Sequence, residues 1–124
     1  MSSRNLVSVV DDDQSVRESL PDFLRSFGHE VWPFVSADEF LQSPEALDLT
    51  GCLILDIAMP GMSGPELQLE LERRDRTIPI VFITAYSDRA VSRQVLRRGA
   101  VACLAKPFSE YLLMDAVSTA LARH

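Results

Sequence analysis

Long apolar runs and cysteine are both scarce in this sequence of 124 residues. No apolar run approaches the roughly 18 residues that a membrane-spanning helix needs, and the run that follows the N-terminus is too short for a secretory signal. The two cysteines, Cys52 and Cys103, are too few for a disulfide framework, and neither has a metal-type partner near it in the sequence. We therefore expect a cytoplasmic protein without a membrane partner, in which both cysteines pack in the core.

Basic residues are also in the minority, with 12 against 18 acidic residues and a net charge of -6. A nucleic-acid-binding domain normally carries a basic excess, so this balance argues against direct binding of DNA or RNA. Lysine is scarcest of all, because Lys106 is the one lysine and the other basic residues are arginine. Apolar residues still make up 47% of the chain, and its length fits a single domain over residues 1–124.

Five short apolar runs predict the strands of a sheet: Leu6–Val10, Val31–Phe34, Cys52–Leu55, Ile80–Ile83 and Val101–Leu104. Val, Ile, Leu and Phe dominate these runs with little polar alternation, which is typical of strands buried on both faces of a parallel sheet. A helical pattern follows each run, so the order is strand then helix, five times over. That alternation predicts an α/β fold with a parallel sheet and helices on both sides of it.

Capping residues mark the five expected helices. The first has Asp13 as its N-cap, and the second begins with Ser36. The third follows Ser63, and the last two start near Asp88 and Ser109. Gly28 and Gly99 stand where a C-terminal glycine ends a helix, and Pro44 helps to end the second one. The last helix has a broad apolar face that includes Leu112 and Leu113.

Pro21 conflicts with the first of these helices. The apolar face of that helix continues on both sides of the proline, as Val16, Leu20, Phe23, Leu24 and Phe27. A proline in a helix interior removes an amide hydrogen and costs about 3 kcal/mol. We predict one helix with a kink on its solvent side, not two helices.

Polar residues follow four of the apolar runs, at the point where each expected strand ends. They are Asp11 and Asp12, then Asp56, then Thr84, then Lys106. In open parallel sheets, ligands bind beyond the carboxyl ends of the strands, so these residues should converge on one edge. Each of them alone has an ordinary explanation, such as a helix start for the acids or a solvated lysine. Together, at four strand ends of one sheet, they favour a functional site.

Three carboxylates at one edge repel one another, because two unit charges 4 Å apart interact by about 4 kcal/mol at an effective dielectric of 20. Protonation or a cation relieves such a cluster. Mg²⁺ fits best, since it combines one or two carboxylates with water and phosphate oxygens. Lys106 and Thr84 suit phosphate oxygens, and Asp56 can be the nucleophile that forms an acyl phosphate. The residues therefore predict Mg²⁺-dependent phosphoryl transfer.

Four motifs carry a resemblance to a known family: Val9–Asp13, Leu53–Gly64, Ile83–Ala85 and Lys106–Phe108. In this order and spacing they resemble the receiver domain of two-component response regulators, over essentially the whole chain. Within that family, the motifs most resemble those of the receivers in nitrogen-fixation-type transcription regulators, which have a helix-turn-helix output domain. The resemblance implies a doubly wound, flavodoxin-like fold with strand order 2-1-3-4-5. In that order the two cysteines would lie on strands about 10 Å apart, too far for a disulfide.

The resemblance also implies roles for the acidic residues. Asp56 would accept the phosphoryl group from a sensor histidine kinase. Asp12 would be the more direct Mg²⁺ ligand, with Asp11 acting partly through water. The backbone carbonyl of Ala58 would complete the metal site.

At the other strand ends, Thr84 would be the switch hydroxyl that moves toward the phosphoryl oxygen. Lys106 would pair with Asp56 or its phosphate, and the bond between Lys106 and Pro107 would be cis, a rare bond type elsewhere. Cys103 occupies the position of the family's rotating aromatic ring, and a thiol cannot perform the same swing. Tyr86 lies two residues after Thr84, and we predict that it partly shields the acyl phosphate from water.

Arg89, Arg93 and Arg97 recur at helical spacing in the fourth expected helix. A solvated face explains them most simply. The functional alternative is a symmetric homodimer, in which these arginines meet Glu110 and Asp115 of a second copy.

Two other functions remain open at this point. A true Mg²⁺-dependent phosphatase with an aspartyl nucleophile often has a second acid two residues on, where this chain has Ala58, and needs a substrate-binding cap. A pseudo-receiver would bind partners without being phosphorylated. The favoured reading is a signalling switch, not a metabolic enzyme, that catalyses only its own phosphorylation and dephosphorylation and regulates transcription through an output domain.

Overall fold

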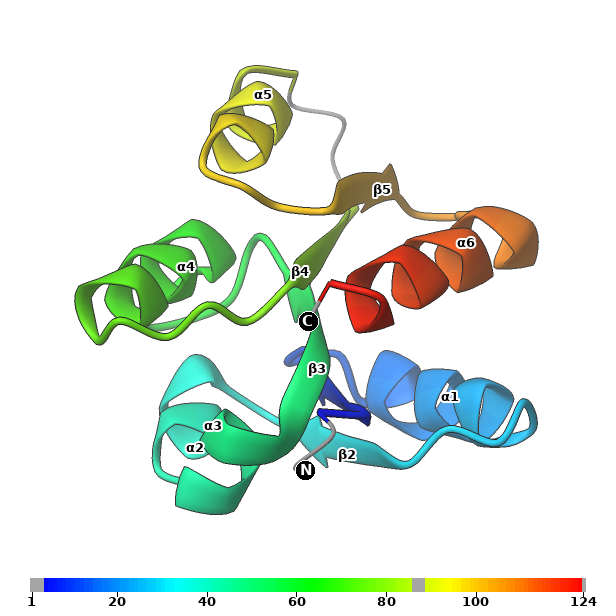
Figure 1. Cartoon of the computed structure of the whole chain (residues 1–124). Coiled ribbons are helices and arrows are strands. Elements are labelled where there is room, and N and C mark those ends of the chain that lie inside the picture. The colour runs from blue at the N-terminus through cyan, green and yellow to red at the C-terminus, as the bar shows by residue number, and fades with distance from the viewer. Residues whose placement is uncertain (1–3, 86–88, 124) are drawn as a thin grey trace.

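A parallel sheet forms the centre of the molecule (Figure 1). The computed structural model describes residues 4–85 and 89–123, and in that part the sheet has five strands in the order β2-β1-β3-β4-β5. The strands are β1 (Leu6–Val10), β2 (Val31–Phe34), β3 (Thr50–Asp56), β4 (Ile80–Thr84) and β5 (Ala102–Ala105). The predicted parallel sheet, its strand order and the doubly wound, flavodoxin-like fold are confirmed.

Helices cover both faces of this sheet: α1 (Gln14–Arg25), α2 (Ala37–Leu41), α3 (Pro44–Leu49), α4 (Gly64–Arg73), α5 (Arg89–Arg97) and α6 (Glu110–Leu121). One core lies between the sheet and α1 and α6, and a second lies between the sheet and the other four helices. Within the described residues, no helix is long and apolar enough to cross a membrane.

The described part of the chain contains six helices, one more than expected. Pro44 does end α2, but it also begins α3, with Ser43 as the N-cap whose side chain accepts from the backbone N–H of Ala46. Proline suits the first turn of a helix because the N–H that it lacks would have no partner there. The sequence prediction treated Pro44 only as a stop signal, and so missed α3.

The helix with Pro21 is continuous from Gln14 to Arg25, as predicted. The kink was predicted on the solvent side, but Pro21 is buried, so that side is wrong. The kink itself stays a prediction. Two residues expected on apolar faces are largely exposed, namely Phe27 at 59% and Leu112 at 51%. Phe27 lies beyond the last residue of α1, where its ring packs edge-on against Phe23 with centroids 5.2 Å apart.

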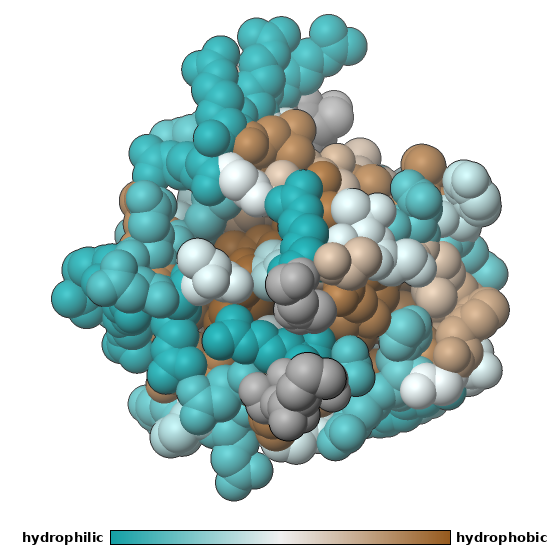
Figure 2. All heavy atoms as spheres, viewed as in Figure 1, coloured by the Kyte–Doolittle hydropathy of each residue, from teal (hydrophilic) through white to brown (hydrophobic). Residues whose placement is uncertain are grey.

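The cysteines and the arginines of α5 lie as predicted. Cys52 is buried on β3, Cys103 is half-buried on β5 with β4 between them, and both thiols are free. Arg89, Arg93 and Arg97 are exposed. Figure 2 shows long hydrophilic side chains gathered over α5, at the top of the view.

Candidate functional site

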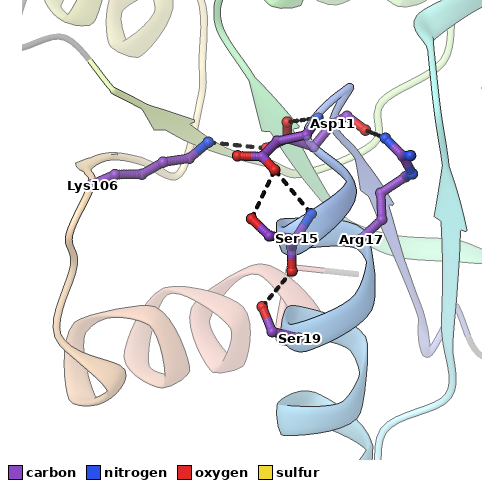
Figure 3. A network of polar contacts seen from close by, with 6 residues as sticks. Asp11, Ser15, Arg17, Ser19 and Lys106 are labelled. Carbon is purple, nitrogen blue, oxygen red and sulfur yellow. Dashed lines mark hydrogen bonds and ion pairs between the residues drawn. The ribbon is translucent and has the colours of Figure 1, made fainter.

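Asp11 follows β1 and has no exposed area. Its Oδ1 accepts from the backbone N–H of Asp13 at 2.9 Å, and its Oδ2 lies 3.2 Å from Nζ of Lys106. Its backbone N–H donates to the carbonyl of Phe34 at 3.2 Å, and its backbone carbonyl accepts from Nη1 of Arg17 at 2.9 Å (Figure 3). These bonds satisfy the polar groups of Asp11, which makes the burial of a carboxylate tolerable.

The other two acids of the triplet differ from Asp11 and from each other. Asp12 is exposed. Asp13 is the N-cap of α1, as predicted, and its Oδ1 accepts from the backbone N–H of Ser15 at 2.9 Å and from the Ser15 hydroxyl at 2.7 Å. These bonds, the hydroxyl bond first, lower the pKa of Asp13. The triplet therefore divides into two acids at the strand end and one helix cap.

Asp56 ends β3 and is buried. The loop that follows it is held to β4 by a hydrogen bond from the backbone N–H of Ile57 to the carbonyl of Ile83 at 3.0 Å. Gly64 closes this loop, because its N–H donates to the carbonyl of Ile57 at 2.9 Å. A Cβ on Gly64 would overlap the backbone carbonyl oxygen of Asp56. Only glycine lets α4 begin this close to the end of β3.

Thr84 ends β4, and Lys106 follows the last residue of β5. Thr84 is buried, and its backbone carbonyl accepts from the N–H of Lys106 at 2.7 Å. The bond between Lys106 and Pro107 is cis, as the family resemblance implied. The ammonium of Lys106 forms its ion pair with Asp11. Its predicted pairing with Asp56 or a phosphate on that residue stays a prediction.

The strand ends bring Asp11, Asp12 and Asp56 together. Each offers a carboxylate oxygen, and these oxygens lie within 4.8 Å of one another. Burial raises the pKa of Asp56 to about 6, and the charge and hydrogen bond of Asp11 add to this effect. Lys106 and the backbone of Ala58 act in the opposite direction. One ammonium group therefore leaves three crowded carboxylates partly uncompensated.

This donor set fits a hard divalent cation such as Mg²⁺. Oxygen ligands from one or two carboxylates, with the remaining positions left to water and phosphate, are what Mg²⁺ prefers in proteins. Asp11, Asp12 and Asp56 would hold the ion, which would offset the repulsion that raises the pKa of Asp56. Ala58 lies two residues beyond β3 and is exposed, and the role of its carbonyl stays a prediction.

Cys103 and Tyr86 have predicted modulating roles, and both roles stay predictions. Cys103 packs against the core on the α5 side of the sheet, and its Sγ lies 3.3 Å from the hydroxyl of Ser92 on α5. Tyr86 lies outside the described residues, as does Asp88, so the shielding role and the helix start remain predictions.

Arg17 and Gly64 contribute to the site without having been predicted to do so. No sequence motif includes Arg17, and its spacing of six residues from Asp11 carries no recognised signal. Gly64 did have a signal, because it closes the motif Met-Pro-x-Met-x-Gly, but its contact with Asp56 depends on the tertiary fold.

Known proteins are similar to the chain over nearly its whole length. Residues 7–118 match the family model of the response regulator receiver domain. Nodulation protein W of Bradyrhizobium diazoefficiens is 46% identical over 122 residues, which cover 98% of this chain and 53% of that protein. Transcriptional regulatory protein FixJ of Azorhizobium caulinodans is 38% identical over 117 residues, which cover 94% of this chain and 55% of that protein.

Solved structures agree with these sequence relatives. The structure of response regulator StyR matches with a TM-score of 0.87 and 48% identity, over 94% of this chain and 58% of that one. The chain thus spans about half the length of the curated relatives that it matches. The family match and the strand-end site lead to one conclusion: the chain belongs to the receiver domains of two-component response regulators.

Proposed function

We propose that this chain is a phosphorylation-dependent switch in which Asp56 accepts a phosphoryl group from a histidine kinase, with Mg²⁺ bound. The observation that carries the proposal is the convergence of three carboxylates within 4.8 Å, beside the one lysine of the chain. Receiver domains generally bind Mg²⁺ at an acidic pocket and interact with histidine kinases. Both properties are consistent with the geometry at this edge of the sheet.

In the proposed step, a carboxylate oxygen of Asp56 attacks the phosphorus of a phosphohistidine. The P–O bond forms, the P–N bond breaks, and the electron pair of that bond returns to the imidazole nitrogen. With a pKa of about 6, most of Asp56 is ionised at pH 7 and able to attack. Lys106 and Thr84 then bind oxygens of the phosphoryl group. Bound Mg²⁺ would supply charge neutralisation at those oxygens.

Intact-mass measurement after incubation with acetyl phosphate and Mg²⁺ tests this proposal. The wild-type chain should gain one phosphoryl group, and Asp56→Asn should gain none. Asp22→Asn is the matched control, because Asp22 is an exposed acid on α1 that pairs only loosely with Arg25, at 3.6 Å. A wild-type chain without added mass would support a pseudo-receiver instead, and an Asp56→Asn chain that still gains the mass would show that Asp56 is not the acceptor.

The exposed arginines of α5 support a homodimer through the surface formed by α5 and α6. Arg89, Arg93 and Arg97 would face Glu110 and Asp115 of a second copy, all of which are exposed. Sedimentation with and without beryllofluoride tests this contact, and equal sedimentation under both conditions contradicts it.

The wider role is proposed from the relatives. FixJ is named a transcriptional regulatory protein, which supports control of transcription, with a further domain making any contact with DNA. The net charge of -6 supports a receiver that does not bind DNA directly. Action in the cytoplasm, where kinases use ATP, completes the proposal. The phosphatase alternative loses its support, because the family is a regulatory one.

A further inference from the structure

Arg17 lies on the first turns of α1 and reaches back to the end of β1. Its side chain is half-buried, and its Nη1 donates to the backbone carbonyl of Asp11 at 2.9 Å. Figure 3 shows the guanidinium on one side of Asp11 and the ammonium of Lys106 on the other. Lys106 binds the side chain of Asp11, whereas Arg17 binds its main chain.

The carbonyl that Arg17 binds belongs to the peptide group that joins Asp11 to Asp12. A peptide group is planar, so a bond to its oxygen restrains the orientation of the residues on both sides. Both residues offer oxygens to the carboxylate cluster. Because Asp12 is exposed, little packing fixes its side chain. The orientation of the preceding peptide group is therefore an important restraint on the position of its Cβ.

We infer that Arg17 is a positioning residue for the Mg²⁺ site, which acts by fixing the peptide group between Asp11 and Asp12. The inference rests on the proposed function, because it concerns the metal that the proposed phosphoryl transfer uses. Groups that hydrogen-bond to metal ligands orient those ligands, and their removal typically weakens metal binding about 10–100-fold.

Charge and position have opposite effects here, which makes the inference testable. The guanidinium is always protonated, so as a charge it repels Mg²⁺ and its removal should strengthen metal binding. As a positioning group it restrains the ligands, and its removal should weaken metal binding. The sign of the change in Mg²⁺ affinity therefore separates the two roles.

Arg25 provides a matched control on the same helix. Its Nη2 donates to the backbone carbonyl of Val31 at 2.7 Å, so it too ties α1 to the backbone of the sheet. Val31 is at the start of β2, whereas the carboxylate cluster lies at the carboxyl ends of the strands. Arg25→Met therefore removes the same kind of bond from a place that does not touch the metal site.

Isothermal titration calorimetry with Mg²⁺ tests the inference on the wild-type chain and three variants. Arg17→Met should bind Mg²⁺ about tenfold more weakly. Arg17→Lys, which keeps the charge and can still donate to the carbonyl of Asp11, should recover part of this loss. Arg25→Met should bind Mg²⁺ like the wild-type chain, whatever it loses in thermal stability.

Phosphorylation by acetyl phosphate supplies a second readout. The Mg²⁺ concentration for half-maximal rate should rise in Arg17→Met, while the rate at saturating Mg²⁺ should return toward the wild-type value. Unchanged or tighter Mg²⁺ binding by Arg17→Met overturns the positioning role and leaves the proposed function standing. Absence of Mg²⁺ binding by the wild-type chain overturns both. If Arg17→Met does not fold, the Mg²⁺ affinity and the Mg²⁺ dependence of the phosphorylation rate are measured on Arg17→Gln instead.

Discussion

Strands β3 and β5 lie on either side of β4, yet they differ in burial. All seven residues of β3 are buried, whereas none of the four residues of β5 is fully buried. The helix next to β5 explains part of this, because α5 buries only Val95, and three of its arginines face solvent. The acids of the site follow or end the well-packed strands β1 and β3, and Lys106 comes from the loosely packed side.

This difference in burial indicates which strands are rigid and which can open locally. Close packing fixes side-chain positions, and sparse burial lowers the free energy of local opening. We therefore expect substitutions in the central strands to disturb stability and site together. Equivalent substitutions around α5 and β5 should have smaller effects on both.

Matched leucine truncations should give the largest difference. Leu53 on β3 is fully buried, and Leu53→Ala should lower the free energy of unfolding by about 3–5 kcal/mol. Leu104 on β5 is only partly buried, so less apolar area is lost, and Leu104→Ala should cost about 1–2 kcal/mol. Urea denaturation measures both values, and equal losses would show that the two strands are packed alike.

The strands were largely predictable from the sequence, because burial on both faces requires continuous apolar runs. The exception at β3 is informative, since that strand begins at Thr50, before the predicted start at Cys52. Thr50 is polar, but it is fully buried beside Ser8, with the two hydroxyl oxygens 2.7 Å apart. A buried polar pair of this kind cannot be recognised from hydropathy, because hydropathy does not show which polar residues find a hydrogen-bond partner in the core.

The site was predictable to the level of strand ends and no further. Asp11, Asp56 and Thr84 could be placed because parallel strands share a carboxyl edge. The pairing of Lys106 with Asp11 could not, because the sequence does not show which carboxylate a long side chain reaches. The same holds for Arg17, whose bond goes to a backbone carbonyl and so depends on no particular partner side chain.

Alanine at Gly64 should be the next most damaging change. Its Cβ would overlap the backbone oxygen of Asp56 and would lie 3.0 Å from the ring of Phe82, so we expect a loss of about 3 kcal/mol. Gly99, between α5 and β5, is the control, because it has a φ of +104° with no atom near the added Cβ. Gly99→Ala should cost about 1–2 kcal/mol from backbone strain alone.

The two glycine variants should also differ in function. Gly64→Ala should slow phosphorylation by acetyl phosphate, because it moves the residue that receives the phosphoryl group. Gly99→Ala should leave that rate unchanged. Equal rates of phosphorylation in the two variants would show that the loop after β3 does not affect the chemistry of Asp56.

Asp56→Asn should stabilise the metal-free protein at pH 7, by up to about 3 kcal/mol. The folded state raises the pKa of Asp56 from 3.8 to about 6, so it binds the proton more tightly than the unfolded state does. Stability from this group is full below pH 4 and is lost as the pH rises through 6. The advantage of the asparagine variant should therefore be absent at pH 3.5 and develop between pH 4 and 7.

Thermal unfolding across this pH range measures the effect, and Mg²⁺ supplies the control. Added Mg²⁺ should stabilise the wild-type chain more than Asp56→Asn, because the variant lacks one charged ligand. An asparagine variant that is less stable than wild type at pH 7 without metal would contradict the picture of uncompensated carboxylates.

Serine-to-alanine changes at two hydroxyl contacts should give the smallest effects, and they test the comparison at the level of single bonds. Ser92 on α5 contacts Cys103 on β5 at 3.3 Å, at a half-buried position where a thiol is a weak partner. Ser92→Ala should therefore cost about 0.5 kcal/mol. Ser8→Ala breaks the fully buried pair with Thr50 and should cost about 1–2 kcal/mol. If Ser92→Ala lowers the free energy of unfolding as much as Ser8→Ala does, the side-chain contact between α5 and β5 is as strong as the one between β1 and β3. The contrast between the two regions would then lie in apolar packing alone.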